Sequence, residues 1–437
     1  MGGCVAMSAS AQETKQSQDL SVELNPVVVT GTGTHHRLKD TPTPVEVVTA
    51  NDIKKAGITD FREAMTALVP SLSFSTNSMG DYLMLNGLSN KYVLILINGK
   101  KLTGDSSNNI DLNRIDMSNV KRIEVLKGAG SALYGSDAIG GVINIITNQP
   151  INDITVTSNT KVEERGQFTQ TANVDIKTEK FASYTSYQRR QSDGWTLTRV
   201  DADGEARDQH DANAFYTDNY TQMFQFTPND KLSMYVEGSY YDRTVKRQPE
   251  YLKYNLTYDA YSLGAGAKYN FNKRSYIQFD IKNDNYDTNY LYTNEDGDNK
   301  VGDEVRQKRQ HYYSGNLKSL FRFTENTRTI FGVEYIQETL DRPSFNVDER
   351  AYTWAAYAQE EITLFKNLQI QAGLRYVYHE TAKSNVTPKL AVMYRLGDFT
   401  IRGQYSAGFR APGLDELYKY SYSQRGTRAG TLSAGNK

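Results

Sequence analysis

The sequence predicts an antiparallel β-barrel that spans a membrane, with a small α/β domain in front of it, and three observations carry this prediction. The longest aliphatic run is Val93–Ile97, far short of the roughly 20 residues that a spanning helix needs. Residues 151–437 alternate apolar and polar side chains almost throughout, which is the period of a β-strand. The 437 residues include 31 Tyr, and aromatic residues gather at the membrane interfaces of outer-membrane barrels.

Charge and cysteine content exclude two other classes of protein. The net charge is -1, so the composition does not favour a nucleic-acid partner. Cys4 is the only cysteine, so the chain cannot be a scaffold of internal disulfides.

The N-terminus indicates secretion. Ala9-Ser10-Ala11 has the small-x-small pattern of a signal-peptidase site, so we interpret residues 1–11 as the remnant of a signal peptide. An ordinary flexible N-terminus is the alternative. The polar residues 12–25 are expected to form a flexible leader.

Residues 26–150 mix short helices with short apolar strands, and about 120 residues are enough to bury a core. Asp60 and Glu63 predict a helix start, and Pro70 ends that helix. Asn98-Gly99 predicts a tight turn between strands. The other expected elements are strands at 93–97, 100–102, 120–126 and 142–147 and a helical turn at 131–134.

The rest of the chain predicts long strands joined by short turns on one side and longer polar loops on the other, as in outer-membrane barrels. One strand alternates Leu368, Ile370, Ala372, Leu374 and Tyr376 with Gln369, Gln371, Gly373 and Arg375. The tight turns are expected at Thr178-Glu179, Asn229-Asp230, Asn272-Lys273, Glu325-Asn326, Lys366-Asn367 and Gly397-Asp398. A soluble β-sandwich or propeller is the alternative, but soluble strands average only about 5–6 residues.

Strand counting predicts an incomplete barrel. Six turns join strands in pairs and one strand at about Thr155–Lys161 precedes them, which makes 13 strands. Bacterial single-chain barrels have even counts, and those that hold a folded domain have about 22 strands. We therefore expect about 13 of 22 strands in residues 151–437, with the remainder cut off at the C-terminus.

A folded domain in front of a barrel lies either inside the lumen or in the periplasm. Inside, it would block diffusion, and a partner anchored elsewhere would have to move it. A short strand-forming segment could serve as the handle by adding to the partner's sheet. The candidate handle is Pro26, Val27, Val28, Val29, Thr30 and Gly31. The alternative is that Val27–Val29 is simply the first strand of the domain.

Two motifs resemble TonB-dependent outer-membrane receptors. The run from Val120 to Gly128, followed by Ser131 to Thr147, is similar to the end of that family's plug domain, and Gly408-Phe409-Arg410-Ala411-Pro412 is similar to a mid-barrel signature. Gly435-Asn436-Lys437 looks like the opening of the next box. Leu85-Asn86-Gly87 departs from the family, which usually has Arg in the middle position.

The resemblance implies a plug domain in the barrel lumen at residues 26–150 and a TonB box at 26–31. It further implies a Gram-negative outer-membrane location in contact with outer-membrane lipid, a TonB-type energy-transducing partner and a monomer when full length. Arg114, Asp116, Arg122 and Glu124 are candidates for ion pairs between plug and barrel wall, with a solvated surface role as the alternative.

The plug sequence looks most like the siderophore, cobalamin and colicin receptor branch. The implied cargo is a ferric siderophore, with cobalamin as the alternative; haem is disfavoured because residues 413–437 contain no His. The polar apical turns of the plug could face cargo, and their candidate binding residues are Asn77, Ser78, Asp81, Asp105, Ser106, Asn108 and Asn109.

Two acidic loops are candidate calcium sites, because carboxylates at alternate positions near a Gly suit Ca²⁺. The first contains Asp201, Asp203, Asp208 and Asp211, and the second spans 294–303. Neither has the full ligand spacing, so a solvated loop is the alternative. We expect no other cofactor.

No catalytic motif is present, so we expect no enzyme activity. A barrel enzyme and a surface receptor that binds without importing remain rival hypotheses. Deletion of the candidate handle distinguishes them from an importer.

Overall fold

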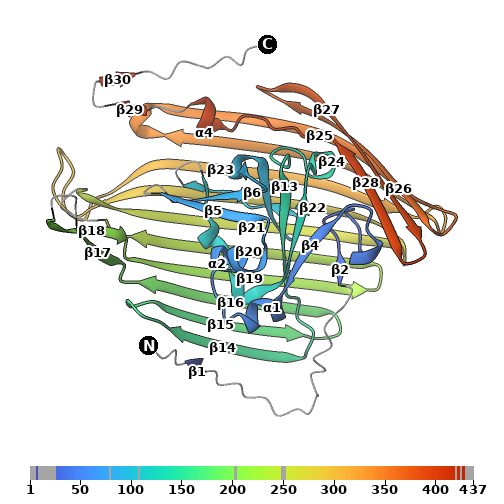
Figure 1. Cartoon of the computed structure of the whole chain (residues 1–437), viewed down its shortest axis with the longest axis horizontal. Coiled ribbons are helices and arrows are strands. Elements are labelled where there is room, and N and C mark those ends of the chain that lie inside the picture. The colour runs from blue at the N-terminus through green and yellow to red at the C-terminus, as the bar shows by residue number, and fades with distance from the viewer. Residues whose placement is uncertain are drawn as a thin grey trace.

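A single curved antiparallel sheet wraps around the N-terminal domain (Figure 1). The computed structural model describes residues 6–7, 26–77, 80–106, 109–200, 204–247, 252–418, 421–423 and 426–428. The sheet has 14 strands, of which β1 (Ala6–Met7) is a two-residue strand paired with β14. The other 13 form the wall of a partial barrel, which confirms the predicted fold class and strand number.

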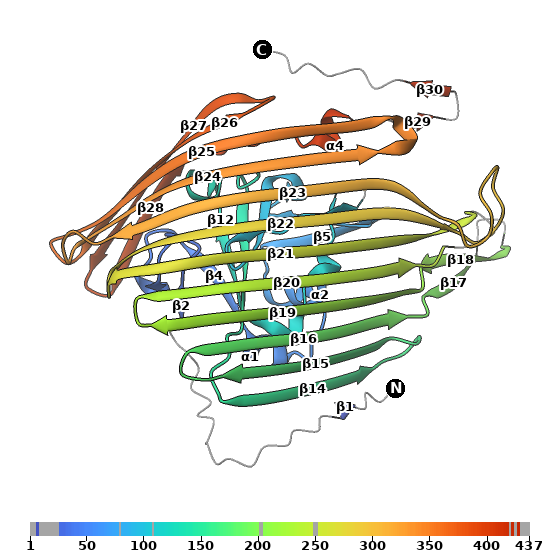
Figure 2. The same cartoon turned by 180° about the vertical axis from the view of Figure 1, so that it is seen from behind.

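The wall strands follow one another in sequence order, except that β17 (Trp195–Val200) and β18 (Ala206–Ala212) form a separate hairpin between β16 and β19. Figure 2 shows the order from behind. The wall consists of β14 (Ile154–Val162), β15 (Phe168–Lys177), β16 (Phe181–Ser192), β19 (Phe215–Asn229), β20 (Leu232–Val245), β21 (Tyr254–Asn272), β22 (Ser275–Tyr292), β23 (Glu304–Phe321), β24 (Thr327–Arg342), β25 (Val347–Leu364), β26 (Leu368–His379), β27 (Lys383–Leu396) and β28 (Phe399–Ser406). All six predicted tight turns join neighbouring strands of this list.

The two faces of the wall have opposite chemistry, as the alternation predicts. On β26, Leu374 and Tyr376 are 52% and 47% exposed, whereas Gln371 and Arg375 are 0% and 2% exposed. The exposed apolar side chains face away from the plug, and the buried polar ones face it. This inverted pattern fits a barrel whose outer surface meets lipid.

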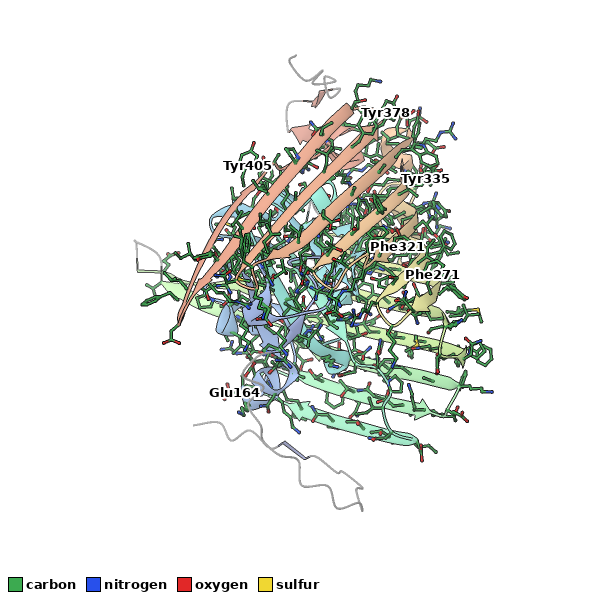
Figure 3. All side chains as sticks on the ribbon, turned by 90° about the vertical axis from the view of Figure 1, so that its right-hand side faces the viewer. Glu164, Phe271, Phe321, Tyr335, Tyr378 and Tyr405 are labelled. Atoms are coloured by element: carbon green, nitrogen blue, oxygen red, sulfur yellow. The ribbon has the colours of Figure 1, made fainter. Side chains whose placement is uncertain are left out.

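Aromatic side chains mark two levels on the outer face. Tyr220 lies directly opposite Tyr240, which lies opposite Tyr261, towards the long loops. Towards the short turns, Phe271 and Phe321 stack with ring centroids 5.8 Å apart (Figure 3). Tyr261 and Phe271 are ten residues apart on β21, or about 33 Å along the strand. With a tilt of about 40°, this separation matches the ~25 Å apolar band of outer-membrane barrels.

None of the helices in the described part of the chain is long and apolar enough to cross a membrane.

The domain at residues 26–150, called the plug below, lies on the concave side of the wall (Figure 1). Its strands are β2 (Val27–Val28), β3 (His36–Arg37), β4 (Val45–Thr49), β5 (Leu72–Asn77), β6 (Gly80–Leu85), β7 (Leu88–Ser89), β8 (Val93–Ile97), β9 (Lys100–Lys101), β10 (Asp105–Ser106), β11 (Asn109–Ile110), β12 (Val120–Lys127) and β13 (Gly141–Thr147). Its helices are α1 (Ala50–Lys55), α2 (Phe61–Leu68) and α3 (Ser131–Tyr134), with 3-10 turns η1 (Leu38–Asp40), η2 (Asn90–Tyr92), η3 (Leu112–Arg114) and η4 (Met117–Asn119).

A five-stranded sheet in the order β4-β12-β13-β8-β9 organises the plug. The core is apolar, with Phe61, Met65 and Ile123 at most 2% exposed. Helix α2 begins as predicted, because the Asp60 carboxylate accepts the Glu63 N–H at 3.0 Å.

The remaining elements lie between or after wall strands: η5 (Pro343–Phe345), α4 (Leu414–Leu417), β29 (Ser421–Ser423) and β30 (Gly426–Arg428). Figure 1 places β2 and β4 near the short turns and α4 and the β17–β18 hairpin near the long loops.

Candidate functional site

The candidate site is the interface between plug and wall, which encloses a cavity of about 980 Å³. Both domains line it. Thr103 and Asp105 come from the plug, and Asp280 and Lys282 come from β22. The polar side chains of β22 thus face this cavity, on the side of the strand that the alternation of apolar and polar residues assigns to the inside of the barrel.

A buried ion pair joins the plug to β22. The Arg114 guanidinium lies 2.7 Å from the Asp284 carboxylate, and the two side chains are only 6% and 0% exposed. Lys282 lies 3.1 Å from Asp284, and the Thr103 hydroxyl donates to the same carboxylate. Burial alone opposes the charge of Arg114, but Asp284 outweighs burial and raises its pKa. The prediction of a plug–wall ion pair is confirmed for Arg114.

Wall tyrosines hold a buried carboxylate of the plug, that of Asp111. The hydroxyls of Tyr241 and Tyr286 donate to it at 2.6 and 2.9 Å. Burial opposes ionisation of Asp111, but Arg243 and these hydrogen bonds outweigh burial, and its pKa lies below its usual value. The contacts of Arg114 and Asp111 with β20 and β22 are called the charged attachment below.

The wall holds a different part of the plug through its backbone. The carbonyls of Gly31, Thr32 and Gly33 accept hydrogen bonds from Lys389, Gln359 and Lys318 at 3.0, 2.7 and 2.6 Å. These donors come from β27, β25 and β23, every second strand of the wall. The three contacts are called the carbonyl attachment below.

The candidate handle is docked on the plug just before this attachment. Val27–Val28 pairs with His36–Arg37. The Glu124 carboxylate accepts the N–H groups of Val29 and Thr30 at 2.9 and 2.8 Å. The sequence left two alternatives for Val27–Val29, a handle or the first strand of the plug. In this structure Val27–Val28 forms the first strand of the plug, and the use of the segment as a handle stays a prediction.

The other predicted ion-pairing residues make different contacts from those expected. Arg122 and Glu124 pair with each other at 2.7 Å, within the plug rather than across to the wall. Their side chains lie next to each other on one face of β12, where the handle segment covers Glu124. Asp116 reaches the wall through a hydrogen bond from the Ser186 hydroxyl instead of an ion pair.

The structure describes only some of the predicted cargo residues in full. The Asp105 N–H donates to Gln310 at 2.9 Å, and Asp105 lines the cavity. Asn109 is buried, and its side-chain oxygen accepts a hydrogen bond from Asn90 of η2 at 2.9 Å. Ser78 and Asn108 lie outside the described residues, as do the side chains of Asn77, Asp81 and Ser106.

The calcium hypothesis stays a prediction. Asp201 and Asp203 lie outside the described residues, and Asp208 and Asp211 lie in β18 with their side chains outside them. In the second loop, Asp296 lies 3.1 Å from Lys253. Among the side chains that the structure describes, no three His, Cys, Asp or Glu are grouped closely enough to hold a metal ion.

Sequence reasoning did not single out the wall residues of either attachment, namely Tyr241, Asp284, Tyr286, Lys318, Gln359 and Lys389. The alternation pattern was an available signal, because each of these residues lies at a position of its strand that the pattern assigns to the inner face. The pattern tells which face a side chain lies on, but not which plug residue it meets.

Two family descriptions cover nearly the whole chain. Residues 37–142 match the family described as "TonB-dependent Receptor Plug Domain", and residues 146–437 match "TonB dependent receptor-like, beta-barrel".

Curated relatives agree with these matches. The chain is 24% identical to the Iron-regulated outer membrane virulence protein of Vibrio cholerae, covering 95% of the chain and 64% of the relative. It is 25% identical to the Vitamin B12 transporter BtuB of Vibrio cholerae, covering 91% and 64%. It is also 25% identical to the Ferric enterobactin receptor PirA of Pseudomonas aeruginosa, covering 94% and 64%. The chain thus spans about 64% of the length of these relatives.

Solved structures share the fold. The siderophore receptor PirA from Pseudomonas aeruginosa matches with a TM-score of 0.64 at 21% identity, covering 85% of this chain and 62% of that one. The siderophore receptor PirA from Acinetobacter baumannii matches with a TM-score of 0.71 at 17% identity, covering 86% and 62%.

Proposed function

Because the chain belongs to the family of TonB-dependent receptors, we propose that the protein imports a scarce ferric siderophore by energised movement of its plug. The chain is a protein of the bacterial outer membrane, as its family and relatives are. The substrate, the energised step and the partner are the proposed parts.

The observation that carries the proposal is the two-part attachment of the plug to the wall. Breaking a buried ion pair such as Arg114–Asp284 costs about 3–5 kcal/mol, because an uncompensated charge is left behind. The contacts of Asp111 and of the Gly31–Gly33 carbonyls add to this cost, so moving the plug as a whole requires many buried contacts to break together. In this proposal, a TonB-type partner supplies the work for that step.

The handle for this partner is Pro26–Gly31. Val27–Val28 pairs with His36–Arg37 in a two-stranded sheet, so its second edge is not used within that sheet and is the edge to which a partner strand would add. To bind the segment, the partner would first have to break its hydrogen bonds with Glu124.

A ferric siderophore is the favoured cargo because two of the relatives are named for iron, one as iron-regulated and one as a ferric enterobactin receptor. Cobalamin is the second candidate, because BtuB is equally similar in sequence.

The test compares binding and uptake of ferric catecholate chelates and of cobalamin by the complete gene product in outer membranes. We expect saturable binding and uptake of an iron chelate. If only cobalamin is taken up, the proposed substrate is wrong but the proposed import function stands.

Deletion of Val27–Thr30 tests the mode of action, with deletion of the leader residues 15–18 as the control of equal length. An importer keeps binding and loses uptake on the first deletion only. A surface receptor keeps its binding and never shows uptake, and a barrel enzyme keeps its turnover.

A further inference from the structure

A segment of the barrel domain, residues 407–418, leaves the wall after β28 and packs between plug and wall; we call it the strap. On the plug side, the N–H of Phe409 donates to Ser131 Oγ at 3.1 Å and the N–H of Ala411 donates to Ser136 Oγ at 3.0 Å. On the wall side, Leu414 packs with Leu340 on β24.

Two neighbouring carboxylates of the strap face different domains. Asp415 accepts from Gln310 Nε2 at 2.5 Å, lies 3.4 Å from Lys308, and pairs with Arg342, all of which are wall residues. Glu416 pairs with Lys91 of the plug instead. Helix α4 thus connects the two domains through consecutive residues.

The wall partners of Asp415 also hold the cargo-side hairpin of the plug, β10–β11. Lys308 donates to the backbone carbonyl of Asp105, and Gln310 Oε1 accepts the Asp105 N–H at 2.9 Å. Gln310 therefore uses its amide nitrogen for Asp415 and its amide oxygen for the hairpin. Asp105, Gln310 and Asp415 all line the cavity.

The charge balance at this point depends on Asp415. Lys308 and Asp415 are 8% and 7% exposed, and Arg342 is the second cation beside the same carboxylate. Without that negative charge, Lys308 and Arg342 would share only the nearby Asp105 carboxylate in a poorly hydrated place. Lys308 would move away from Arg342, and its contact with the hairpin would be lost.

We propose that Asp415 is a positioning residue that holds the β10–β11 hairpin of the plug at the cavity through Lys308 and Gln310. The hairpin's contact with an iron chelate rests on the proposed function; its positioning by the strap does not.

The test uses Asp415→Asn in the complete outer-membrane protein, with a spin label on a cysteine at Ser107 between β10 and β11. A second label at Thr66, on the exposed face of α2, reports on the rest of the plug. Asp341→Asn is the matched control, because Asp341 on β24 neighbours Arg342 in the sequence but pairs with Arg306 on β23.

We expect Asp415→Asn to increase the mobility of the Ser107 label and to leave the Thr66 label unchanged, while Asp341→Asn changes neither. Binding of a ferric catecholate should weaken about tenfold, as for a lost hydrogen bond to a charged group. Higher mobility at Ser107 without chelate binding by any form of the protein supports the positioning role and refutes the proposed cargo.

Unchanged mobility at Ser107 in Asp415→Asn overturns the proposal, and so does an equal increase at both labels. If this variant does not reach the membrane, Gln310→Ala replaces it, because it removes the side chain that joins Asp415 to the Asp105 N–H. The same local increase at Ser107 is then expected, and its absence overturns the proposal.

Discussion

The plug is attached to the wall in two chemically different ways. The charged attachment pairs side chain with side chain, as in Arg114–Asp284, and both partners are buried. The carbonyl attachment pairs wall side chains with the plug backbone at Gly31–Gly33. The hydrogen bonds of the carbonyl attachment can break one at a time, at about 1–3 kcal/mol for each buried group left unpaired, whereas splitting the buried ion pair costs about 3–5 kcal/mol in one step. We therefore expect the segment after the handle to separate first and the region around Arg114 last.

The largest effect is expected from Asp284→Ala. It leaves Arg114 buried without its carboxylate, which should destabilise the plug by about 3–5 kcal/mol. Hydrogen exchange of plug amides in the reconstituted protein measures this loss. The double variant Arg114→Leu with Asp284→Leu should recover part of it, because Arg114 is no longer left unpaired, although Lys282 still loses Asp284. Equal loss in the single and double variants would contradict a role for the unpaired charge.

Acidification tests the same attachment through Asp111. Because the folded-state pKa of Asp111 lies below its usual 3.8, its contribution is complete above pH ~4 and is lost as pH falls through the lower folded value. Asp111→Asn should lower plug stability by about 2 kcal/mol at pH 7 and should flatten the acid limb of the stability curve. Amide protection measured from pH 7 to 3 in both forms gives the result. An unchanged acid limb in the variant would show that other carboxylates dominate.

Glu124→Gln tests the docking of the handle. The carboxylate accepts from Val29, Thr30 and the Thr30 hydroxyl, and a neutral amide accepts more weakly. We expect a cost of about 1–2 kcal/mol, to which the lost charge pairing with Arg122 contributes, and faster proteolysis at residues 26–31. Glu46→Gln is the control, because Glu46 pairs with Lys127 at the surface of the same sheet. Equal proteolysis in both variants would argue that Glu124 does not hold the segment.

The smallest effect is expected from Gln359→Leu, which removes one donor of the carbonyl attachment at Thr32. One neutral hydrogen bond contributes about 0.5–1.5 kcal/mol. The uptake rate should rise slightly or stay unchanged while amide protection near Arg114 is kept. A large loss of protection near Arg114 would remove the distinction between the two attachments.

The sequence alone determined the local structure and the family. The alternation of apolar and polar residues depends only on neighbours within one strand, so the wall strands, the six turns and the lipid-facing phase were predictable from it. The helix start at Asp60 was predictable for the same reason, because its capping partner Glu63 is three residues away.

Only the tertiary structure decided which side chains meet. Arg114 and Asp284 are 170 residues apart, and nothing in the sequence near either one names the other. The curvature of the wall and the position of the plug select that pair. They also turn Glu124 towards the handle instead of the wall, and they place the Asn109 side chain against Asn90 of η2. A local sequence pattern determines the face of a strand on which a side chain lies. Which residues of the two domains pair depends on distances that exist only after folding.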